Sequence, residues 1–280
     1  MIEIVRTVDD LRGWVTNCRA KGQSVGLVPT MGALHAGHMA LAARSLDVTE
    51  RSVASLFVNP RQFGEGEDLE SYPRNEDDDG AKLEAAGVHL LFAPSVDEMY
   101  PQGFTTGVRV GALGDILEGA YRPGFFDGVA TVVSKLLNQA GANRAFFGEK
   151  DYQQLLVVRT MARDLDIPTV IEGVETVREA DGLALSSRNV YLSPDERRAA
   201  PILYKTISDV AAGAKDAASI AALENKAREQ VLAAGFCDVD YLSVHDAGTL
   251  QPYQDRSRPG RVLVAAKLGR TRLIDNVPVL

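Results

Sequence analysis

Two histidines three residues apart are the side chains whose spacing most clearly suggests chemistry. His35 and His38 lie in the segment TMGALHAGH, residues 30–38, which follows a short apolar run. A strand-to-helix turn of this composition offers free backbone N–H groups, the positive end of a helix dipole and glycines that let a ligand approach the backbone. The imidazoles can donate to phosphate oxygens as charge moves. We therefore predict a polyphosphate site; the alternative is a glycine-rich turn with incidental histidines.

Two further segments place cations beside amides or hydroxyls. FFGEKDYQQ puts Lys150 at a predicted turn from strand into helix and Gln154 one helical turn later. Such a lysine can neutralise phosphate, and such an amide can bind a small polar acid. The segment LSSRN, residues 185–189, adds two hydroxyls and Arg188. Simpler interpretations stay open, because a lysine at a helix start is usually solvated and SSRN is common in loops.

Carboxylates and the remaining histidines suggest less. The acidic run at residues 76–79 is most simply a solvated helix start, where carboxylates complement the helix dipole. Asp78 and Asp79 are nevertheless candidates for holding Mg²⁺ through water, since Mg²⁺ keeps much of its hydration shell when it binds a polyphosphate. We predict structural roles for His89, within a predicted buried strand, and for His245, at a strand end.

Alternating strands and helices must position these residues. Apolar runs predict buried strands, and the segments between several of them predict helices. The predicted strands are residues 24–30, 51–60, 88–94, 144–150 and 168–177, and the predicted helices are residues 38–49, 81–87, 129–141 and 152–166. This alternation indicates an α/β fold, a Rossmann-like parallel sheet with helices on both faces. Strands that are apolar throughout are typical of sheets covered on both sides.

The last hundred residues have a different character. Two long helical stretches, residues 194–215 and 218–234, precede two apparent strands, VDYLSVHD and RVLVAAKLG. We therefore predict a Rossmann-like domain over residues 1–180 and a small C-terminal α+β domain over residues 181–280.

Composition limits the class of function. The 280 residues carry a net charge of −8, which argues against a general nucleic-acid binder because such proteins present basic faces to phosphates. No apolar run is long enough to span a bilayer, and the N-terminal residues do not resemble a signal peptide. Cys18 and Cys237 fit neither a disulfide framework nor a metal-binding spacing. We expect a cytoplasmic protein without a membrane partner.

Seven segments together resemble one enzyme family along nearly the whole chain. In chain order they are PTMGALHAGH, FVNPRQF, YPRNEDDD, EGAYRPG, FFGEKDYQQL, READGLALSSRNVYL and RLIDN. The first resembles the HxGH signature of the nucleotidylyltransferase superfamily, and LSSRN resembles that superfamily's degenerate KMSKS-type loop. The combination is similar to the pantothenate synthetase family, and FFGEKDYQQL and DGLALSSRN distinguish that family within the superfamily.

The resemblance implies a ligase that uses Mg²⁺ and ATP to activate pantoate as an acyl-adenylate, joins it to β-alanine, and releases AMP and pyrophosphate. It also implies a homodimer and a C-terminal domain that acts as a lid. Two alternatives stay open: another HxGH nucleotidyltransferase, or a nucleotide-binding paralogue with weak or no catalysis.

Residue roles follow from the same resemblance. His35 and His38 would contact the ATP phosphates, with Lys150 and Arg188 as further catalytic cations, and Val177 would contact adenine through its backbone. The implied ATP-binding residues are Met31, Gly32, Ala33, Leu34, His35, Ala36, Gly37, His38, Gly148, Glu149, Lys150, Asp151, Val177, Leu185, Ser186, Ser187 and Arg188. Gln62 and Gln154 would hold pantoate, and Asn59 and Arg122 would lie close by.

One position departs from the family pattern. The family usually has RPGHF where this chain has Arg122-Pro123-Gly124-Phe125-Phe126, so Phe125 replaces a histidine. A phenyl ring fills the volume but cannot donate a hydrogen bond. We predict that Phe125 packs, because Phe126 beside it indicates a hydrophobic wall.

Overall fold

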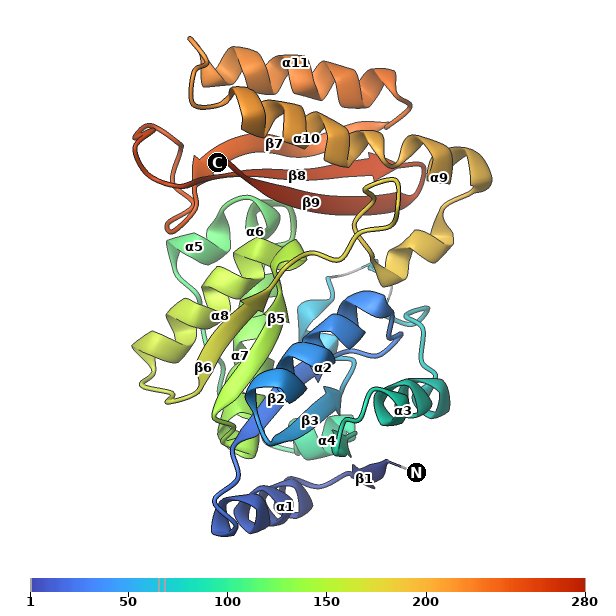
Figure 1. The fold of residues 1–280 in the computed structure, drawn as a ribbon, viewed down its shortest axis with the longest axis vertical. Helices are drawn as coiled ribbons and strands as arrows, with labels where there is room; N and C mark the ends of the chain where they lie inside the picture. The colour runs from blue at the N-terminus through green and yellow to red at the C-terminus, as the bar shows by residue number, and fades with distance from the viewer. Residues whose placement is uncertain (1, 65, 68, 280) are drawn as a thin grey trace. The chain divides into compact units, whose positions relative to one another are not determined.

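A computed structural model describes residues 2–64, 66–67 and 69–279 and divides them into two compact units. The first unit runs to Glu149 and includes Gln154–Glu175; the second contains Lys150–Gln153 and the chain from Thr176 onward. Figure 1 draws both. Glu65 and Asp68, in the acidic part of residues 64–80, lie outside the described residues. The predicted domain boundary at residue 180 stays a prediction, and the sequence did not predict that residues 150–153 group with the second unit.

The first unit contains the predicted parallel sheet. Its six strands have the order β1-β4-β3-β2-β5-β6, and all neighbours run parallel, which confirms the fold class. The strands are β1 (Glu3–Val5), β2 (Val25–Thr30), β3 (Arg51–Leu56), β4 (Leu90–Phe92), β5 (Arg144–Gly148) and β6 (Val170–Val174). The sequence did not predict β1, a three-residue edge strand whose residues are partly or fully exposed.

Helices cover both faces of this sheet. The long ones are α1 (Val8–Ala20), α2 (Ala36–Val48), α3 (Glu76–Ala85), α7 (Phe125–Ala140) and α8 (Tyr152–Asp164). Short ones are η1 (Pro60–Gln62), α4 (Val96–Met99), α5 (Ala112–Asp115), α6 (Glu118–Tyr121) and η2 (Glu149–Asp151). In Figure 1, α2 lies in front of β2 and α7 lies behind the sheet. A core that includes Val28, Leu83, Leu91 and Phe146 fills the space beneath α2 and α3.

One prediction about the sheet is wrong. Strand β6 was expected to be covered on both faces, but Val170 is exposed and the other four residues are only partly buried. β6 is an edge strand with a neighbour on one side only, so its apolar composition does not report full burial.

Strand order explains how distant motifs meet. The carboxyl ends of β3, β2 and β5, which are neighbours in a parallel sheet, lie at one edge. Residues 31–38 follow β2, residues 57–62 follow β3, and Gly148 ends β5. Strand β2 lies in the middle of the sheet. The next strands along the chain, β3 and β4, lie on one side of it, and the later strands β5 and β6 lie on the other side. Such a switch point is where ligands bind in open α/β sheets.

The second unit is built on a three-stranded antiparallel sheet, β7 (Asp238–Asp246), β8 (Gly260–Leu268) and β9 (Thr271–Val279). Its helices are η3 (Ser187–Tyr191), α9 (Pro194–Ala199), α10 (Ile202–Gly213) and α11 (Ile220–Ala233). An apolar core between the helices and the sheet includes Leu203, Ile207, Val231 and Val264. The prediction of only two strands is wrong, because β9 is a third. No helix in the described ranges is long and apolar enough to cross a membrane.

Candidate active site

The two predicted histidines cap the helix that follows β2. His35 is the N-cap residue of α2: its Nδ1 accepts from Gly37 N at 3.1 Å, and His38 Nδ1 accepts from His35 N at 3.3 Å. The ring centroids lie 4.2 Å apart. An Nδ1 that accepts leaves the proton of a neutral imidazole on Nε2. Both histidines therefore carry an Nε2–H donor at a helix N-terminus, the arrangement that suits a phosphate oxygen.

A buried carboxylate shapes the loop before these histidines. Asp79 is 1% exposed, and its oxygens accept from Ala33 N at 2.9 Å and Leu34 N at 2.8 Å. Gly32 has φ +89°, and a Cβ there would lie 3.0 Å from the Asp79 carboxylate; Ala33 has φ +52°, which is uncommon for a residue with a side chain. Asp79 thus holds the loop in a conformation that the backbone alone disfavours.

The predicted magnesium role of Asp78 and Asp79 gains little from this geometry. Both oxygens of Asp79 bind backbone N–H groups, and Asp78 forms an ion pair with Lys82 at 2.7 Å. Among the residues that the structure describes, no group of three or more His, Cys, Asp or Glu side chains could hold a metal ion. The two carboxylates do not fit a site of direct protein ligands, and water-mediated contact stays a prediction.

A chain of hydrogen bonds orients Gln62, the residue predicted to hold pantoate. Tyr100 Oη donates to Asn59 Oδ1 at 2.7 Å, Asn59 Nδ2 donates to Gln62 Oε1 at 3.0 Å, and Gln62 Nε2 lies 2.9 Å from Met31 Sδ. Asn59 is 1% exposed and also donates to Gly128 O. Burial raises the pKa of Tyr100 to about 12, against the opposing charge of Arg61, so its phenol stays protonated as the donor.

Three predicted residues therefore meet in the first unit: Asn59, Gln62 and Met31. Tyr100 lies in an irregular glycine-rich segment and belongs to no motif, so the sequence does not predict its role. The amide of Gln62 is turned by its neighbours so that its N–H₂ group faces a thioether, a weak acceptor. An oxygen of a bound acid would be a better acceptor for the same group.

Arg122 lies beside this chain. Its Nη2 donates to Gln62 O at 3.2 Å, and its guanidinium forms two hydrogen bonds with Glu67, at 2.6 and 2.7 Å. Glu118, which is buried, lies 3.5 Å away. The Arg122 Cζ also lies 3.8 Å from the centroid of the Phe125 ring, so Phe125 stacks on the cation and Phe126 is the residue that is fully buried.

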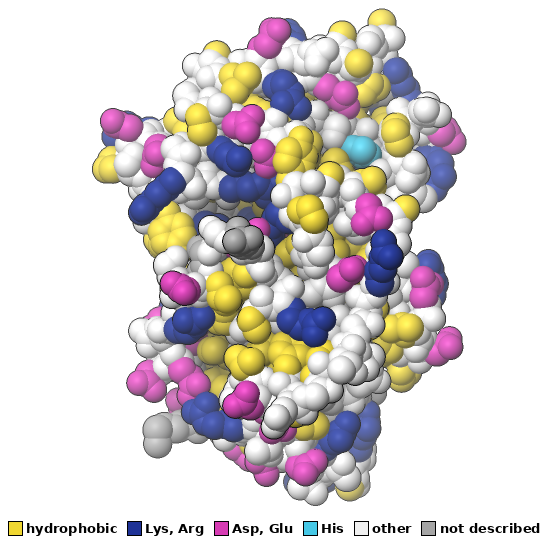
Figure 2. Space-filling view, turned by 180° about the vertical axis from the view of Figure 1, so that it is seen from behind, with side chains coloured by type: hydrophobic (Ala, Val, Ile, Leu, Met, Phe, Trp, Pro, Cys, Tyr) yellow, Lys and Arg dark blue, Asp and Glu magenta, His cyan; other side chains and the backbone are white. Residues whose placement is uncertain are grey.

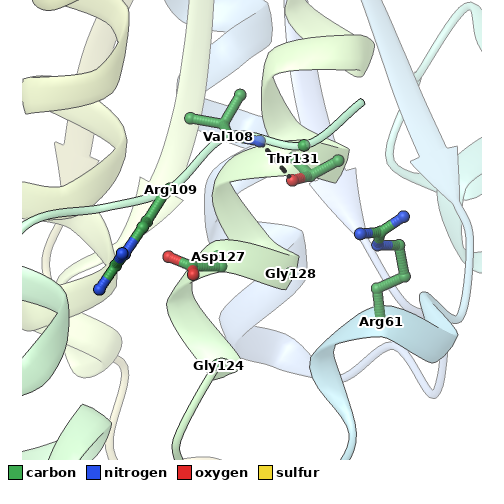
Figure 3. Close-up of a pocket in the computed structure, with 8 residues that line it drawn as sticks. Arg61, Val108, Arg109, Gly124, Asp127, Gly128 and Thr131 are labelled. Atoms are coloured by element: carbon green, nitrogen blue, oxygen red, sulfur yellow. Dashed lines mark hydrogen bonds between the residues drawn. The ribbon is translucent and has the colours of Figure 1, made fainter. Parts of the chain in front are cut away.

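The cavity in Figure 3 lies in the first unit and has a volume of about 260 Å³. It is lined by Arg61, Gly107, Val108, Arg109, Gly124, Asp127, Gly128 and Thr131. Val108 N donates to Thr131 Oγ1 at 2.9 Å across its wall. None of these eight residues belongs to the predicted site, so the cavity gives no support to the predicted ligands.

The remaining predicted nucleotide residues fall mostly in the second unit. There Leu185 N donates to Val177 O at 3.0 Å, which brings two of them together, and Ser186 Oγ accepts from Arg188 N at 3.3 Å at the start of η3. The Lys150 ammonium lies 3.8 Å from the Asp151 carboxylate and is mostly buried. Gly148, Glu149 and Gln154 belong to the first unit, so the predicted set draws on both units.

The distribution of surface charge favours an anion site made of a few residues and not a broad basic face. Basic and acidic side chains are interspersed on the face that Figure 2 shows, in keeping with the net charge of −8. An anionic ligand must then be held by a few placed donors and cations.

The other two histidines make structural contacts. His89, just before β4, accepts from Ser52 N at 3.1 Å, and His245 lies 2.8 Å from both Ser243 Oγ and Leu250 O. The carbonyl can only accept, so His245 Nδ1 carries the proton and Nε2 accepts from the hydroxyl. Burial lowers the pKa of both histidines, and hydrogen bonds to the backbone partly oppose this at His245.

We expect His245 to make stability depend on pH. Below its ordinary pKa of about 6.5 the unfolded chain binds a proton that the folded state resists, so the free energy of unfolding falls as the pH drops from about 6.5 through the lowered pKa. His245→Gln, which retains a donor and an acceptor, should reduce this loss between pH 7 and pH 5, measured by urea unfolding. Equal slopes for variant and wild type would contradict the assignment.

Comparison with known proteins gives one family. The family model for pantoate-beta-alanine ligase matches residues 3–278. A pantothenate synthetase of Paramagnetospirillum magneticum is 56% identical over 278 residues, covering 99% of this chain and 98% of its own. The crystal structure of pantothenate synthetase from Thermus thermophilus has a TM-score of 0.93 at 49% identity, with 99% of both chains covered.

A more distant relative carries ligands. The crystal structure of pantoate-beta-alanine ligase from Francisella tularensis, complexed with beta-gamma ATP and beta-alanine, has a TM-score of 0.82 at 32% identity and covers 99% of this chain and 97% of its own. The identities of 56% and 49% over nearly the full length, together with the strand order and the motif positions, go well beyond a shared fold. The chain belongs to the pantoate-beta-alanine ligase family.

Proposed function

We propose that this protein condenses pantoate with β-alanine to pantothenate, using ATP and releasing AMP and pyrophosphate. The observation that carries the proposal is the contact between Gln62 Nε2 and Met31 Sδ at 2.9 Å. Met31 opens the loop that leads to His35 and His38, so an amide suited to a small hydroxy acid touches the loop suited to a nucleotide. ATP can activate the acid only if the acid-binding site and the nucleotide-binding site are in direct contact.

The first step is adenylation. The pantoate carboxylate attacks the α-phosphorus of ATP, an oxygen–phosphorus bond forms, and the bond to the β-phosphate breaks to release pyrophosphate. His35 and His38 donate from Nε2 to phosphate oxygens, and Lys150 and Arg188 offset charge as it moves to the leaving group. The backbone of residues 31–34, fixed by Asp79, lines the nucleotide.

The second step is amide formation. The neutral amine of β-alanine attacks the acyl carbon, the carbon–oxygen bond to AMP breaks, and the proton lost by the amine passes to the leaving AMP phosphate or to water. An adenylate is needed because a free carboxylate is an unreactive acyl donor, whereas the acyl-adenylate carries AMP as a good leaving group. Mg²⁺ would accompany ATP and screen its phosphates, and Asp78 would contact it only through water. We also propose a homodimeric, cytoplasmic enzyme whose second unit acts as a lid.

One incubation tests the reaction. The purified protein with Mg-ATP, pantoate and β-alanine should yield pantothenate, AMP and pyrophosphate in equal amounts by mass spectrometry. A stable nucleotide-linked product would favour another nucleotidyltransferase. ATP binding without any product would favour a non-catalytic paralogue.

Gln62→Ala should raise the KM for pantoate by about 10- to 100-fold, because a hydrogen bond to a charged ligand contributes about 1.5 to 3 kcal/mol. The KM for ATP should change little. Asn59 still donates to Gly128 O, so no buried donor is stranded. Gln139→Ala, at another buried glutamine of this unit, is the matched control. An ATP defect as large as the pantoate defect would assign Gln62 to the wrong ligand.

Phe125→His should leave kcat/KM within about threefold, since the ring stacks on Arg122 and a histidine can occupy the same volume. If the family's histidine instead donates a hydrogen bond, kcat/KM should rise by roughly tenfold, the effect of a neutral bond at the strong end of the usual range of about 0.5 to 1.5 kcal/mol. Steady-state kinetics separate the two results. A wild type that forms no adenylate while Phe125→His does would identify this chain as a degenerate paralogue.

A further inference from the structure

Two adjacent polar residues lie inside β9, the strand that the sequence did not predict. Asp275 is 4% exposed and Asn276 is 3% exposed. Buried polar side chains are costly unless each is hydrogen-bonded, so their partners show what they do. Both belong to the RLIDN segment, to which the proposed function gives no role.

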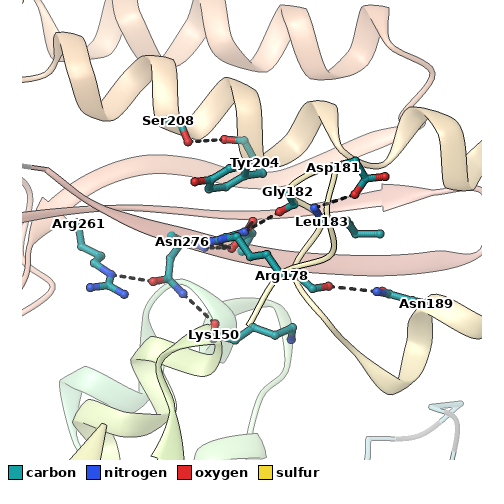
Figure 4. A network of polar contacts seen from close by, with 12 residues as sticks. Lys150, Arg178, Asp181, Gly182, Leu183, Asn189, Tyr204, Ser208, Arg261 and Asn276 are labelled. Atoms are coloured by element: carbon teal, nitrogen blue, oxygen red, sulfur yellow. Dashed lines mark hydrogen bonds and ion pairs between the residues drawn. The ribbon is translucent and has the colours of Figure 1, made fainter. Parts of the chain in front are cut away.

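Asn276 holds the segment that carries Lys150. Its Nδ2 donates to Lys150 O at 2.8 Å, and its Oδ1 accepts from Arg261 Nε at 2.7 Å (Figure 4). The Arg261 guanidinium in turn lies 4.0 Å from the centroid of the Tyr152 ring, and Tyr152 Oη donates to Ala247 O at 2.9 Å. Residues 150–153 are thereby fixed to the second unit at three points, two of them on the sheet strands β8 and β9 and one at Ala247, just after β7.

Asp275 holds the segment that leads to Arg188. Its two oxygens accept from Arg178 Nη1 at 2.7 Å and Nη2 at 2.9 Å, and the same guanidinium donates to Gly182 O and Asn276 O. Arg178 also lies over the Tyr204 ring at 3.9 Å. With five contacts on a side chain that is only 17% exposed, this guanidinium is fixed in position.

The fixed arginine anchors a short hairpin. Arg178 and Ala184 form an antiparallel bridge, and Asn189 Nδ2 donates to Ala184 O at 3.1 Å. Residues 185–188, which carry the predicted hydroxyls and Arg188, lie between these two contacts. The position of Arg178 therefore determines where residues 185–188 begin.

We propose that Asp275 and Asn276 are positioning residues that place the two cation-bearing segments of the second unit, residues 150–153 and 178–189, for adenylation. Neighbouring residues of a strand point to opposite faces, so one dipeptide reaches both segments. The proposal rests on the proposed function, because it assigns Lys150 and Arg188 to ATP. Asp275 and Asn276 themselves touch no substrate in this proposal.

Asn276→Asp is the sharpest test. The carboxylate keeps an acceptor for Arg261 but faces the Lys150 carbonyl with an oxygen in place of a donor, so the segment should shift while the sheet stays folded. Pantoate-dependent exchange of labelled pyrophosphate into ATP should slow by about 10- to 100-fold, as expected when a supporting contact is lost or a reacting group is displaced by about 1 Å. The KM for pantoate should not change.

A matched pair of carboxylates separates positioning from stability. Asp275 and Asp240 are both almost fully buried, and each pairs with an arginine of the second unit, Arg178 for Asp275 and Arg272 for Asp240. Asp275→Asn and Asp240→Asn should lower the unfolding temperature by similar amounts. Only Asp275→Asn should slow pyrophosphate exchange. Equal losses of exchange in the two variants would overturn the proposal.

A double-mutant cycle tests the route. In a Lys150→Ala background the backbone carbonyl remains, but the ammonium is gone, so Asn276→Asp should slow exchange by no more than about threefold further if it acts through Lys150. A full 10- to 100-fold further loss would overturn the proposal.

Hydrogen exchange gives a readout that needs no turnover. Amides of residues 150–153 should exchange faster in Asn276→Asp than in Asp240→Asn, and unchanged protection would overturn the proposal even if the wild type proved inactive. Failure of the wild type to exchange pyrophosphate would instead count against the proposed function.

Discussion

His38→Ala is expected to slow pantoate adenylation by about 10²- to 10³-fold, or roughly 2.7 to 4 kcal/mol, which is the usual effect of removing one preorganised donor to developing charge. The hydrogen bond from His35 N to His38 Nδ1 fixes the ring and leaves the Nε2 proton to donate. The ATP dissociation constant should rise much less than the rate falls. Labelled pyrophosphate exchange and ATP titration measure the two effects.

The same substitution also removes half of a capping box, and a lost cap costs about 1 kcal/mol of stability. Thr7→Ala is the matched control, because Thr7 caps α1, a helix of 13 residues like α2, and lies outside the predicted site. Both variants should unfold at similarly lowered temperatures, while only His38→Ala loses adenylation. An exchange rate in His38→Ala equal to that of Thr7→Ala would remove His38 from the catalytic group.

The parallel sheet was predictable because its central strands are apolar runs that end at turn residues, and because helices alternate with them. The predicted 24–30 and 144–150 match β2 and β5 to within two residues at each end. The edge strands were harder. β1 has only three residues, and β9 contains Asp275 and Asn276, whose buried state depends on partners that are distant in sequence.

The sequence predicted the motifs of the site but not the residues that hold those motifs in place. No sequence pattern indicated that Tyr100 would orient Asn59, because that contact crosses 41 residues of chain. The acidic neighbours of Asp79 make it a magnesium candidate, yet its oxygens accept hydrogen bonds from the backbone N–H groups of Ala33 and Leu34. Local patterns report which groups can do chemistry, whereas tertiary contacts decide which groups hold them in place.

The family histidine replaced by Phe125 illustrates the same limit. The sequence indicated a hydrophobic wall, and Phe126 is buried as a wall residue would be. Phe125 itself stacks on the Arg122 guanidinium, which also forms two hydrogen bonds with Glu67. An aromatic ring can therefore keep a cation in place without donating a hydrogen bond.

Lys150→Ala should slow adenylation by about 10²- to 10³-fold with the fold intact, because the ammonium offsets charge that moves onto the leaving pyrophosphate. Its Nζ lies 3.8 Å from Asp151 Oδ2, and the contact from Asn276 to its backbone carbonyl survives the substitution. Lys150→Arg should recover only part of the rate, since a planar guanidinium does not replace a compact ammonium.

Lys267→Ala is the matched control for Lys150, because the Lys267 ammonium also lies 3.8 Å from a carboxylate of the second unit, that of Asp238. Pyrophosphate exchange at saturating ATP and pantoate measures the rate, and a separate titration measures ATP affinity. If Lys150→Ala raised only the KM for ATP and left the saturated rate unchanged, the ammonium would bind the ground state and the transition state equally. A fall in the saturated rate, absent from Lys267→Ala, is the expected result, because charge that develops during the reaction is stabilised only by a group already in place.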